Sequence, residues 1–450
     1  MPSVLLLAGW TGALFCLAFA APLYVILAGD VIVSIFPWVW HLGGTWVDLR
    51  DVVFAALALG LILRWIRALD AVPRFIPHLW LWITYGLLGS MTYLTLPENQ
   101  SYLTGPAAVA YQLYRYCWKG ILYYPLTVLL LVEERPRTLV VVAVLIAADV
   151  CALEAVSQGY SGLAVQGPFG EKNSLAAVML IPIVLALMEI LDPTSRRSGV
   201  FYLCIASAGL TTRALLISGS RSALVAGVVA CGVFLWGAAR LPRVRSRVIR
   251  LATLTAFVIV LVFSWNPDLS SRPALQRTLS VSTEDGNLQW RLEERWPYFW
   301  AKALKRPWLG WGTDVDLSLG VNTNTSHNGF LAIAVKRGFP AALVFVVLML
   351  LGLRDGMRTY GSAESPKKRL LGLAVGAGVV GLIIHNTVED SFDIPFVSIA
   401  YWTLLAIGAV EARQQVVQRP GEPSREVIFD SVEWAFPRLS TRGAANKARA

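Results

Sequence analysis

Long uninterrupted apolar runs constrain this chain more than any other feature of its sequence. A helix that spans a bilayer needs about 20 apolar residues, and the sequence offers about twelve such runs. Charged residues make up only 15% of the 450 residues, too few to cover the surface of a large soluble protein. The runs are continuous rather than alternating, which argues against a transmembrane β-barrel. We therefore expect an all-α polytopic membrane protein.

Apolar length and helix breakers place the expected spans. They cover residues 4–27, 49–66, 78–96, 108–132, 137–158, 174–192, 199–219, 222–239, 248–265, 339–353, 370–388 and 394–412. The stretch 28–48 is also apolar, but Pro37, Gly43 and Gly44 interrupt it, so we expect a re-entrant or interfacial segment there. Four regions follow: transmembrane helices over 1–265, an external loop with amphipathic helices over 266–338, three more transmembrane helices over 339–412, and a tail over 413–450.

The positions of Lys and Arg predict the orientation of the chain. If the expected spans alternate in direction, most basic residues fall in connections on one side, as in 240–250 and 367–369. The short connections 97–107 and 389–393 on the other side contain no Lys or Arg. By the positive-inside rule the basic side and both termini are cytoplasmic, and the loop 266–338 is external. The net charge of +10 then reflects topology, and we expect membrane lipids rather than nucleic acid as partners.

Basic residues at the expected outer boundary form a candidate anion site. Arg115 and Lys119 lie one turn apart inside the fourth span, where ionisable side chains are costly and usually functional, unless they reach the interface by snorkelling. Arg221 begins a helix after the hairpin SGSRSA, where free backbone N–H groups favour an anion; the alternative is an interfacial anchor. Arg291 and Arg295 in the long loop lie above the same plane. Such guanidinium groups suit a ligand with a lipid tail and a phosphate head.

One histidine lies where the long loop returns to the membrane. In the sequence NTNTSHNGF, we expect Ser326 to cap a short helix that begins with His327 and ends near Val335. His327 is a candidate general base, although a lone histidine is often a hydrogen-bonded structural residue. Further candidates at the same depth are His385, Glu389, Asp390 and Asn328.

No metal or cofactor is expected. The triplet Asp314-Val315-Asp316 matches a pattern by which some glycosyltransferases hold a metal. Two carboxylates alone are a poor cage for a hard cation, so we do not expect them to bind one. The five cysteines lack a C-x-x-C pair, which argues against a thiolate metal site.

Four motifs in order resemble the bacterial O-antigen ligases and the related O-antigen polymerases and protein O-oligosaccharyltransferases. They are GPFGEKNSLA (167–176), SGSRSA (218–223), RLEERW with RPWLGWG (291–296 and 306–312) and SHNGFL (326–331). The resemblance covers residues 160–412 and implies a GT-C-like, metal-independent membrane glycosyltransferase. Arg221 and His327 look like the essential arginine and histidine of the family. Arg291 looks like its loop arginine, with Arg295 as the alternative.

The resemblance also implies the substrates and the location. The donor would be a polysaccharide on undecaprenyl pyrophosphate, the acceptor lipid A–core, and the site would face the periplasm from the bacterial inner membrane. Fixed arginines suit the charge that develops on the leaving oxygen, and direct displacement would invert the anomeric centre. A polymerase, or a ligase acting on protein Ser/Thr, uses the same chemistry and remains an alternative. A flippase or transporter fits less well, because transporters usually place their charges at mid-membrane.

Overall fold

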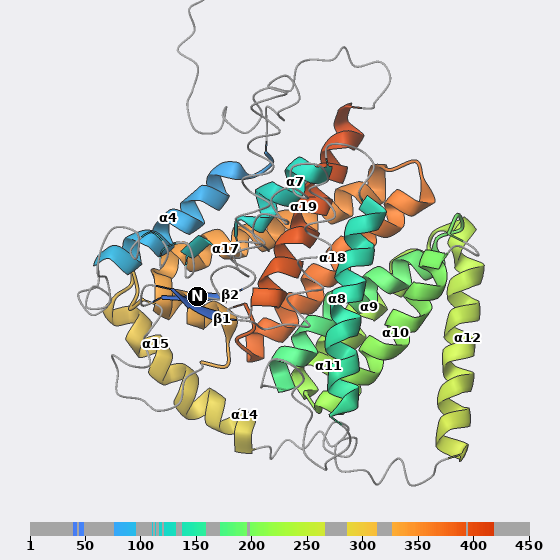
Figure 1. Ribbon diagram of the computed structural model, residues 1–450, viewed down its shortest axis with the longest axis horizontal. Coiled ribbons are helices and arrows are strands. Elements are labelled where there is room, and N and C mark those ends of the chain that lie inside the picture. Colours follow the sequence, from blue (N-terminus) through green and yellow to red (C-terminus); the bar gives the residue numbers. More distant parts are fainter. Residues whose placement is uncertain are drawn as a thin grey trace, which may run out of the picture.

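The computed structural model of the chain is a bundle of helices (Figure 1). It describes residues 39–42, 45–48, 76–95, 121–131, 137–158, 172–195, 199–265, 286–312, 326–392 and 395–417, with single positions between 110 and 118. The expected spans 4–27 and 49–66, together with Arg115, Lys119, Asp314 and Asp316, lie outside these residues. Within 28–48, the stretch expected to be re-entrant or interfacial, β1 (Val39–Leu42) pairs antiparallel with β2 (Thr45–Asp48).

The other elements are helices that follow the apolar runs. They are α4 (Leu79–Thr95), α7 (Tyr123–Leu131), α8 (Arg137–Ser157), α9 (Lys172–Leu191), α10 (Gly199–Ser218), α11 (Arg221–Ala239), α12 (Pro242–Trp265), α14 (Gly286–Trp290), η5 (Arg291–Arg295), α15 (Trp296–Lys305), α17 (Gly329–Ser362), α18 (Pro366–Val388) and α19 (Pro395–Val417). Among the described residues, six helices are long and apolar enough to cross a membrane: most of α8, and α9, α10, α11, α17 and α18. The protein is therefore an all-α polytopic membrane protein, and the number of twelve spans stays a prediction.

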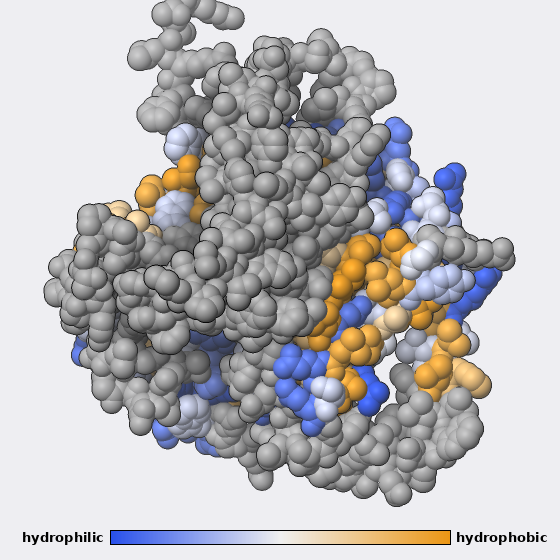
Figure 2. All heavy atoms as spheres, in the orientation of Figure 1, coloured by the Kyte–Doolittle hydropathy of each residue, from blue (hydrophilic) through white to orange (hydrophobic). Residues whose placement is uncertain are grey.

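The outer surface of the bundle is apolar, as a lipid environment requires. Tyr202, Val228 and Leu343 are each at least 60% exposed although they lie in long helices. Figure 2 shows hydrophobic residues gathered to the right of the grey region, with hydrophilic residues around them toward the edge of the view. Lipid tails solvate such side chains without the cost that water would impose.

Small residues bring α11 and α18 close together. Gly237 of α11 lies against Leu373, and Gly381 of α18 lies against Ala226 and Ala230. Residues late in α11 therefore meet residues early in α18, so the two helices run antiparallel. Helices without a large side chain at the contact approach closely, which favours packing in lipid. The first turn of α11 consequently lies level with the last turn of α18.

Basic and acidic side chains pair at the opposite end of the bundle. Lys367 at the start of α18 lies 3.4 Å from Glu189 and 3.5 Å from Asp192, near the end of α9. Arg247 of α12 donates to the backbone carbonyl of Asp192. The basic segments 240–250 and 367–369 thus lie at the same end of the bundle, as expected for segments on the same side of the membrane.

Helix α17 consists of two helices joined across a kink, as the sequence predicts. The first begins at Gly329, the backbone at Gly338 is non-helical (φ 84°, ψ 165°), and the second ends at Ser362. The expected cap was wrong, because Asn328, not Ser326, caps the first helix by accepting from the Leu331 N–H at 3.0 Å. Ser326 donates instead to the Asn328 carbonyl at 2.8 Å, so its hydroxyl is used inside the preceding turn.

The motif RPWLGWG holds the bend of α17. Pro340 has no N–H, so the carbonyl of Lys336 lacks its usual helical donor. The Gly312 N–H donates to that carbonyl at 2.9 Å, and the Trp311 N–H donates to the Val335 carbonyl at 2.8 Å. Phe339 returns a hydrogen bond to the Pro307 carbonyl, also at 2.8 Å. The loop 306–312 therefore satisfies backbone groups that the bend leaves open.

Replacing Gly338 by Ala should destabilise this junction. Gly338 has a positive φ, and a Cβ there would collide with the carbonyl oxygen of Trp308. Strained positions of this kind cost about 1–3 kcal/mol, so we expect Gly338→Ala to lower the thermal unfolding temperature in detergent. Gly361→Ala is the control, since a Cβ there meets nothing within 4 Å. Equal unfolding temperatures for the two variants would contradict the structural role of Gly338.

Candidate active site

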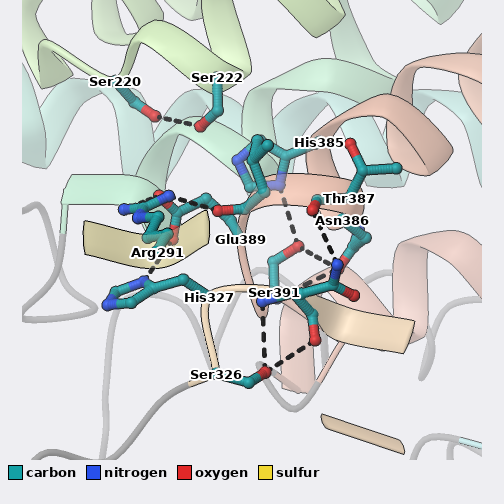
Figure 3. Close-up of polar contacts among 12 residues, drawn as sticks. Ser220, Ser222, Arg291, Ser326, His327, His385, Asn386, Thr387, Glu389 and Ser391 are labelled. Atoms are coloured by element: carbon teal, nitrogen blue, oxygen red, sulfur yellow. Dashed lines mark hydrogen bonds and ion pairs between the residues drawn. The ribbon is translucent and has the colours of Figure 1, made fainter. Parts of the chain in front are cut away.

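Three segments that are distant in sequence meet at the carboxylate of Glu389 (Figure 3). Arg291 of η5 donates from Nη2 to Oε1 of Glu389 at 3.0 Å. His327, just before α17, places Nδ1 3.1 Å from Oε2 of the same carboxylate. Arg291 also donates to the Val388 carbonyl at the end of α18. The structure thus brings Arg291 and His327, both expected site residues, onto one acidic residue.

The charge of Glu389 is stabilised by its partners. Its side chain is only 7% exposed. Burial alone would raise the pKa of Glu389, but the hydrogen bond from His327 and the charge of Arg291 outweigh it and lower the pKa below its usual value. The carboxylate is therefore ionised at neutral pH. Its contribution to stability is present above the usual glutamate pKa and is lost as the pH falls through the lowered value.

The turn before α17 fixes the position of His327. His327 has φ 49°, a left-handed conformation that is uncommon outside glycine. Asn328 holds the turn against α18 by donating from Nδ2 to the Thr387 carbonyl at 3.0 Å. The Gly329 N–H donates to the Glu389 carbonyl at 2.9 Å. Backbone strain that is held by several hydrogen bonds is typical of a functional site.

The ring of His327 is oriented for proton transfer. With Nδ1 directed at Glu389, the neutral imidazole carries its hydrogen on Nδ1 and keeps the lone pair on Nε2. Trp290 packs edge to face beside the ring at a centroid distance of 6.2 Å. The side chain of His327 is 24% exposed, which leaves it accessible to a substrate. A histidine backed by a carboxylate in this way can accept a proton from a hydroxyl group.

Arg221 lies at the same end of the bundle as Glu389. It is the first residue of α11, whose first turn is level with the last turn of α18. The side chain of the capping residue Ser220 makes no capping hydrogen bond to a backbone N–H of α11. In Figure 3, Ser220 and Ser222 are drawn above Arg291 and Glu389. The start of α11 therefore combines a guanidinium group with backbone N–H groups, which suits an anion. The other proposed anion ligands, Arg115 and Lys119, lie outside the described residues.

The structure distinguishes between Arg291 and Arg295, the two candidates for the loop arginine of the site. Arg291 reaches Glu389, whereas Arg295 is 7% exposed and stacks over the rings of Trp290 (5.3 Å) and Phe299 (5.0 Å). Arg295 therefore supports the packing of the loop, and Arg291 is the arginine that lies with His327. The π-helical geometry of η5 sets this division, because it changes the angular spacing between the two side chains.

The remaining candidates have other neighbours. Asp390 lies 3.9 Å from Lys336. His385 is fully buried behind the site and pairs with Ser391. The sequence placed Glu389 only among the further candidates and did not predict its pairing with Arg291 and His327, although one signal was present. It follows α18 directly, where the negative end of the helix dipole disfavours a carboxylate, so a cationic partner was to be expected.

An apolar cavity of about 650 Å³ adjoins this cluster. Its walls come from the loop helices and from both sides of the bend in α17: Leu292, Trp296, Pro297, Trp300, Asn328, Phe330, Leu331, Ala334, Phe339 and Ala342. Leu292 and Asn328 directly follow Arg291 and His327 in the chain, so one part of the cavity is next to the polar cluster. Its lining can accommodate a hydrocarbon chain but offers little to a charged group.

Metal-ligating side chains do not gather in the part of the chain that the structure describes. Within it, no group of three or more His, Cys, Asp or Glu residues lies close enough to hold an ion. Both carboxylate oxygens of Glu389 already face Arg291 and His327.

Comparison with known families matches residues 206–346 to the family model described as O-antigen ligase. This segment begins in α10, and it includes Arg221, Arg291 and His327, whereas Glu389 lies beyond it. No curated protein matches the chain. Over residues 206–346, the chain is therefore similar to the O-antigen ligase family.

Proposed function

We propose that the protein is a metal-independent, inverting ligase that transfers a polysaccharide from undecaprenyl pyrophosphate to a sugar hydroxyl of lipid A–core. The family match supports ligase- or polymerase-type activity in O-antigen assembly. The observation that carries the proposal is the contact of His327 and Arg291 with the buried carboxylate of Glu389. We place the reaction at the periplasmic face of the bacterial inner membrane.

His327 acts as the general base in this proposal. The acceptor hydroxyl gives its proton to Nε2 of His327 while its oxygen attacks the anomeric carbon. The bond from that carbon to the pyrophosphate oxygen breaks, and the lipid pyrophosphate leaves with the bonding electrons. Glu389 accepts a hydrogen bond from Nδ1 and stabilises the imidazolium that forms. In-line attack from the opposite face inverts the anomeric centre.

Arginines stabilise the leaving group. Charge grows on the pyrophosphate oxygen in the transition state, and fixed cations at that point lower the barrier. Arg221 and the N–H groups that begin α11 are the main ligands in this proposal, with Arg115 and Lys119 contributing from the preceding part of the chain. Arg291 adds positive charge while it holds Glu389 in place.

The apolar cavity supports a lipid-linked donor. The cavity is lined by Leu292 and Asn328, which directly follow Arg291 and His327 in the chain. A hydrocarbon chain that occupies the cavity could therefore place its polar end near Arg291 and His327. A soluble sugar nucleotide has no group that benefits from such a lining. The cavity therefore fits a substrate that arrives from the membrane.

Substitution of Arg221 should separate charge from geometry. Arg221→Lys keeps the positive charge but loses the planar fork that binds phosphate, so transfer should still fall substantially, by about tenfold or more. Arg221→Ala should lower both donor affinity and transfer rate, because the charge acts in the ground state and more strongly in the transition state. Donor binding and transfer are measured side by side at matched expression. Full activity of Arg221→Ala would remove this residue from the site.

A deletion phenotype tests the reaction. Loss of a ligase should leave short lipopolysaccharide and long chains retained on the lipid carrier. Loss of a polymerase should instead leave a single repeat on the core. Normal lipopolysaccharide with a change in glycoprotein would favour transfer to protein Ser/Thr. Purified protein with lipid-linked polysaccharide and lipid A–core should then reproduce the transfer.

Reporter fusions test the orientation. A fusion at Gly286, at the start of α14, should report a periplasmic position, because the loop that carries Arg291 is proposed to be external. A fusion at Gly421, in the tail, should report the cytoplasm. The opposite pattern would place the site on the wrong side of the membrane for a periplasmic acceptor.

A further inference from the structure

His385 faces the first turn of α11 across the interface of α11 and α18. Gly381 of α18 lies against Ala230, whose Cβ would be 3.0 Å from an added Cβ, and near the carbonyl of Ala226. His385 follows Gly381 by one turn, and Ser222 precedes Ala226 by one turn. His385 and Ser222 therefore lie on the faces by which α18 and α11 contact each other. Because the helices are antiparallel, the two residues lie at the same level. Figure 3 shows His385 on the side of the site where Ser222 lies.

The hydrogen bonds around His385 fix the position of its proton. Ser391 donates its hydroxyl hydrogen to Oδ1 of Asn386 at 3.0 Å, and its backbone N–H donates to the same atom at 3.2 Å. Asn386 uses Nδ2 to donate to the Leu382 carbonyl, which confirms that Oδ1 is the acceptor. The Ser391 hydroxyl can then only accept from Nδ1 of His385, 3.1 Å away. The neutral ring therefore carries its hydrogen on Nδ1 and has a lone pair on Nε2.

That lone pair belongs to a buried nitrogen. His385 is 0% exposed, and its Nε2 makes no hydrogen bond within the part of the chain that the structure describes. A buried acceptor without a donor is energetically unfavourable, so such atoms usually bind an internal water. Potential donors are near the same level, where the hydroxyls of Ser220 and Ser222 lie 3.2 Å from each other.

We propose that Nε2 of His385 and the hydroxyl of Ser222 share one buried water molecule, and that this link positions Arg221 against the Glu389 turn. The inference rests on the proposed function only in assigning Arg221 to the donor. The water donates one hydrogen to Nε2 and is held by the serine hydroxyl. Glu389 is anchored on the other side, because its N–H donates to the His385 carbonyl at 3.0 Å. His385 is thus a positioning residue that connects the arginine hairpin to the residues that transfer the proton.

Histidine NMR tests the proton assignment without an activity assay. The chain has only four histidines, so ¹⁵N-histidine labelling gives few signals. At neutral pH we expect one signal of a ring protonated on Nδ1 only that disappears in His385→Asn. Its Nε2 resonance should shift in Ser222→Ala, because the water loses a ligand. A His385 ring protonated on Nε2, or an Nε2 resonance that does not change in Ser222→Ala, would overturn the proposal.

Two substitutions at His385 separate its two nitrogens. Asn places an amide N–H near the position of Nδ1 and keeps the bond to Ser391, whereas Gln places its amide near Nε2. We expect His385→Asn and Ser222→Ala each to weaken binding of undecaprenyl pyrophosphate by about three- to tenfold, the usual size of one hydrogen bond. The double variant should be no weaker than either single one, because both remove the same link. His385→Gln should retain more affinity than His385→Asn.

The control is Ser362→Ala, which removes a hydroxyl bonded to the Arg358 carbonyl at the far end of α17 and should not affect binding. Independent losses that multiply in the double variant, or wild-type affinity in both single variants, would refute the link. Should His385→Asn fail to fold, Ser222→Ala and the NMR of the unmodified protein still decide the matter. Normal NMR and binding results without any transfer activity would instead contradict the proposed function.

Discussion

Replacing His327 by Ala should lower the transfer rate by about 10²- to 10⁴-fold while leaving binding of the lipid-linked donor nearly unchanged. The imidazole contacts Glu389 through Nδ1 and offers Nε2 to the acceptor, so it acts in the chemical step. The phosphate ligands in the proposal are arginines, which this variant retains. The measurement compares donor binding with single-turnover transfer, in protein whose thermal unfolding matches that of the wild type.

The outcome of this experiment distinguishes a base from a structural residue. Loss of donor binding together with transfer would mean that His327 contacts phosphate or holds the loop, and another group would have to take the proton. Retained transfer would exclude His327 from the reaction. Partial rescue of His327→Ala by added imidazole would support proton transfer directly, because free imidazole supplies the missing group without restoring the contact to Glu389.

Replacing Glu389 by Gln should have the second largest effect. The amide keeps the size of the side chain but removes the charge that Arg291 and His327 share. The imidazolium then loses its stabilising partner, and we expect transfer to fall by about 10²-fold or more. Arg291, whose side chain is 11% exposed, is left as a buried charge without its carboxylate, which costs about 3–5 kcal/mol. Transfer rate and thermal unfolding are measured together.

Glu293→Gln is the matched control, because it makes the same chemical change on an exposed residue of η5 that bonds to Gln289. It should leave both transfer and stability unchanged. In the wild-type protein, acidification through the lowered pKa of Glu389 should reproduce the defect of Glu389→Gln. Equal activity of Glu389→Gln and Glu293→Gln would mean that the buried carboxylate is not needed.

Local sequence patterns determined the secondary-structure elements of this protein. The length of each apolar run predicts a membrane helix because the bilayer sets that length, and α8, α9, α10, α11 and α18 follow the expected ranges closely. The hairpin before Arg221 and the helix after His327 could also be predicted, because caps and turns depend on a few adjacent residues. One such local expectation was wrong, the choice of Ser326 as the cap, because the competing Asn328 also has a suitable side chain.

Only the tertiary structure decided which side chains meet. Arg291 and Arg295 are equivalent in the sequence, yet Arg291 bonds to Glu389, 98 residues away, while Arg295 stacks on aromatic rings. His327 meets the same carboxylate across 62 residues. The bend at Gly338 likewise depends on the loop 306–312, which supplies the donors that Pro340 removes from the helix. The lengths of helices follow from neighbouring residues, whereas these contacts depend on how whole helices pack, and no local pattern contains that information.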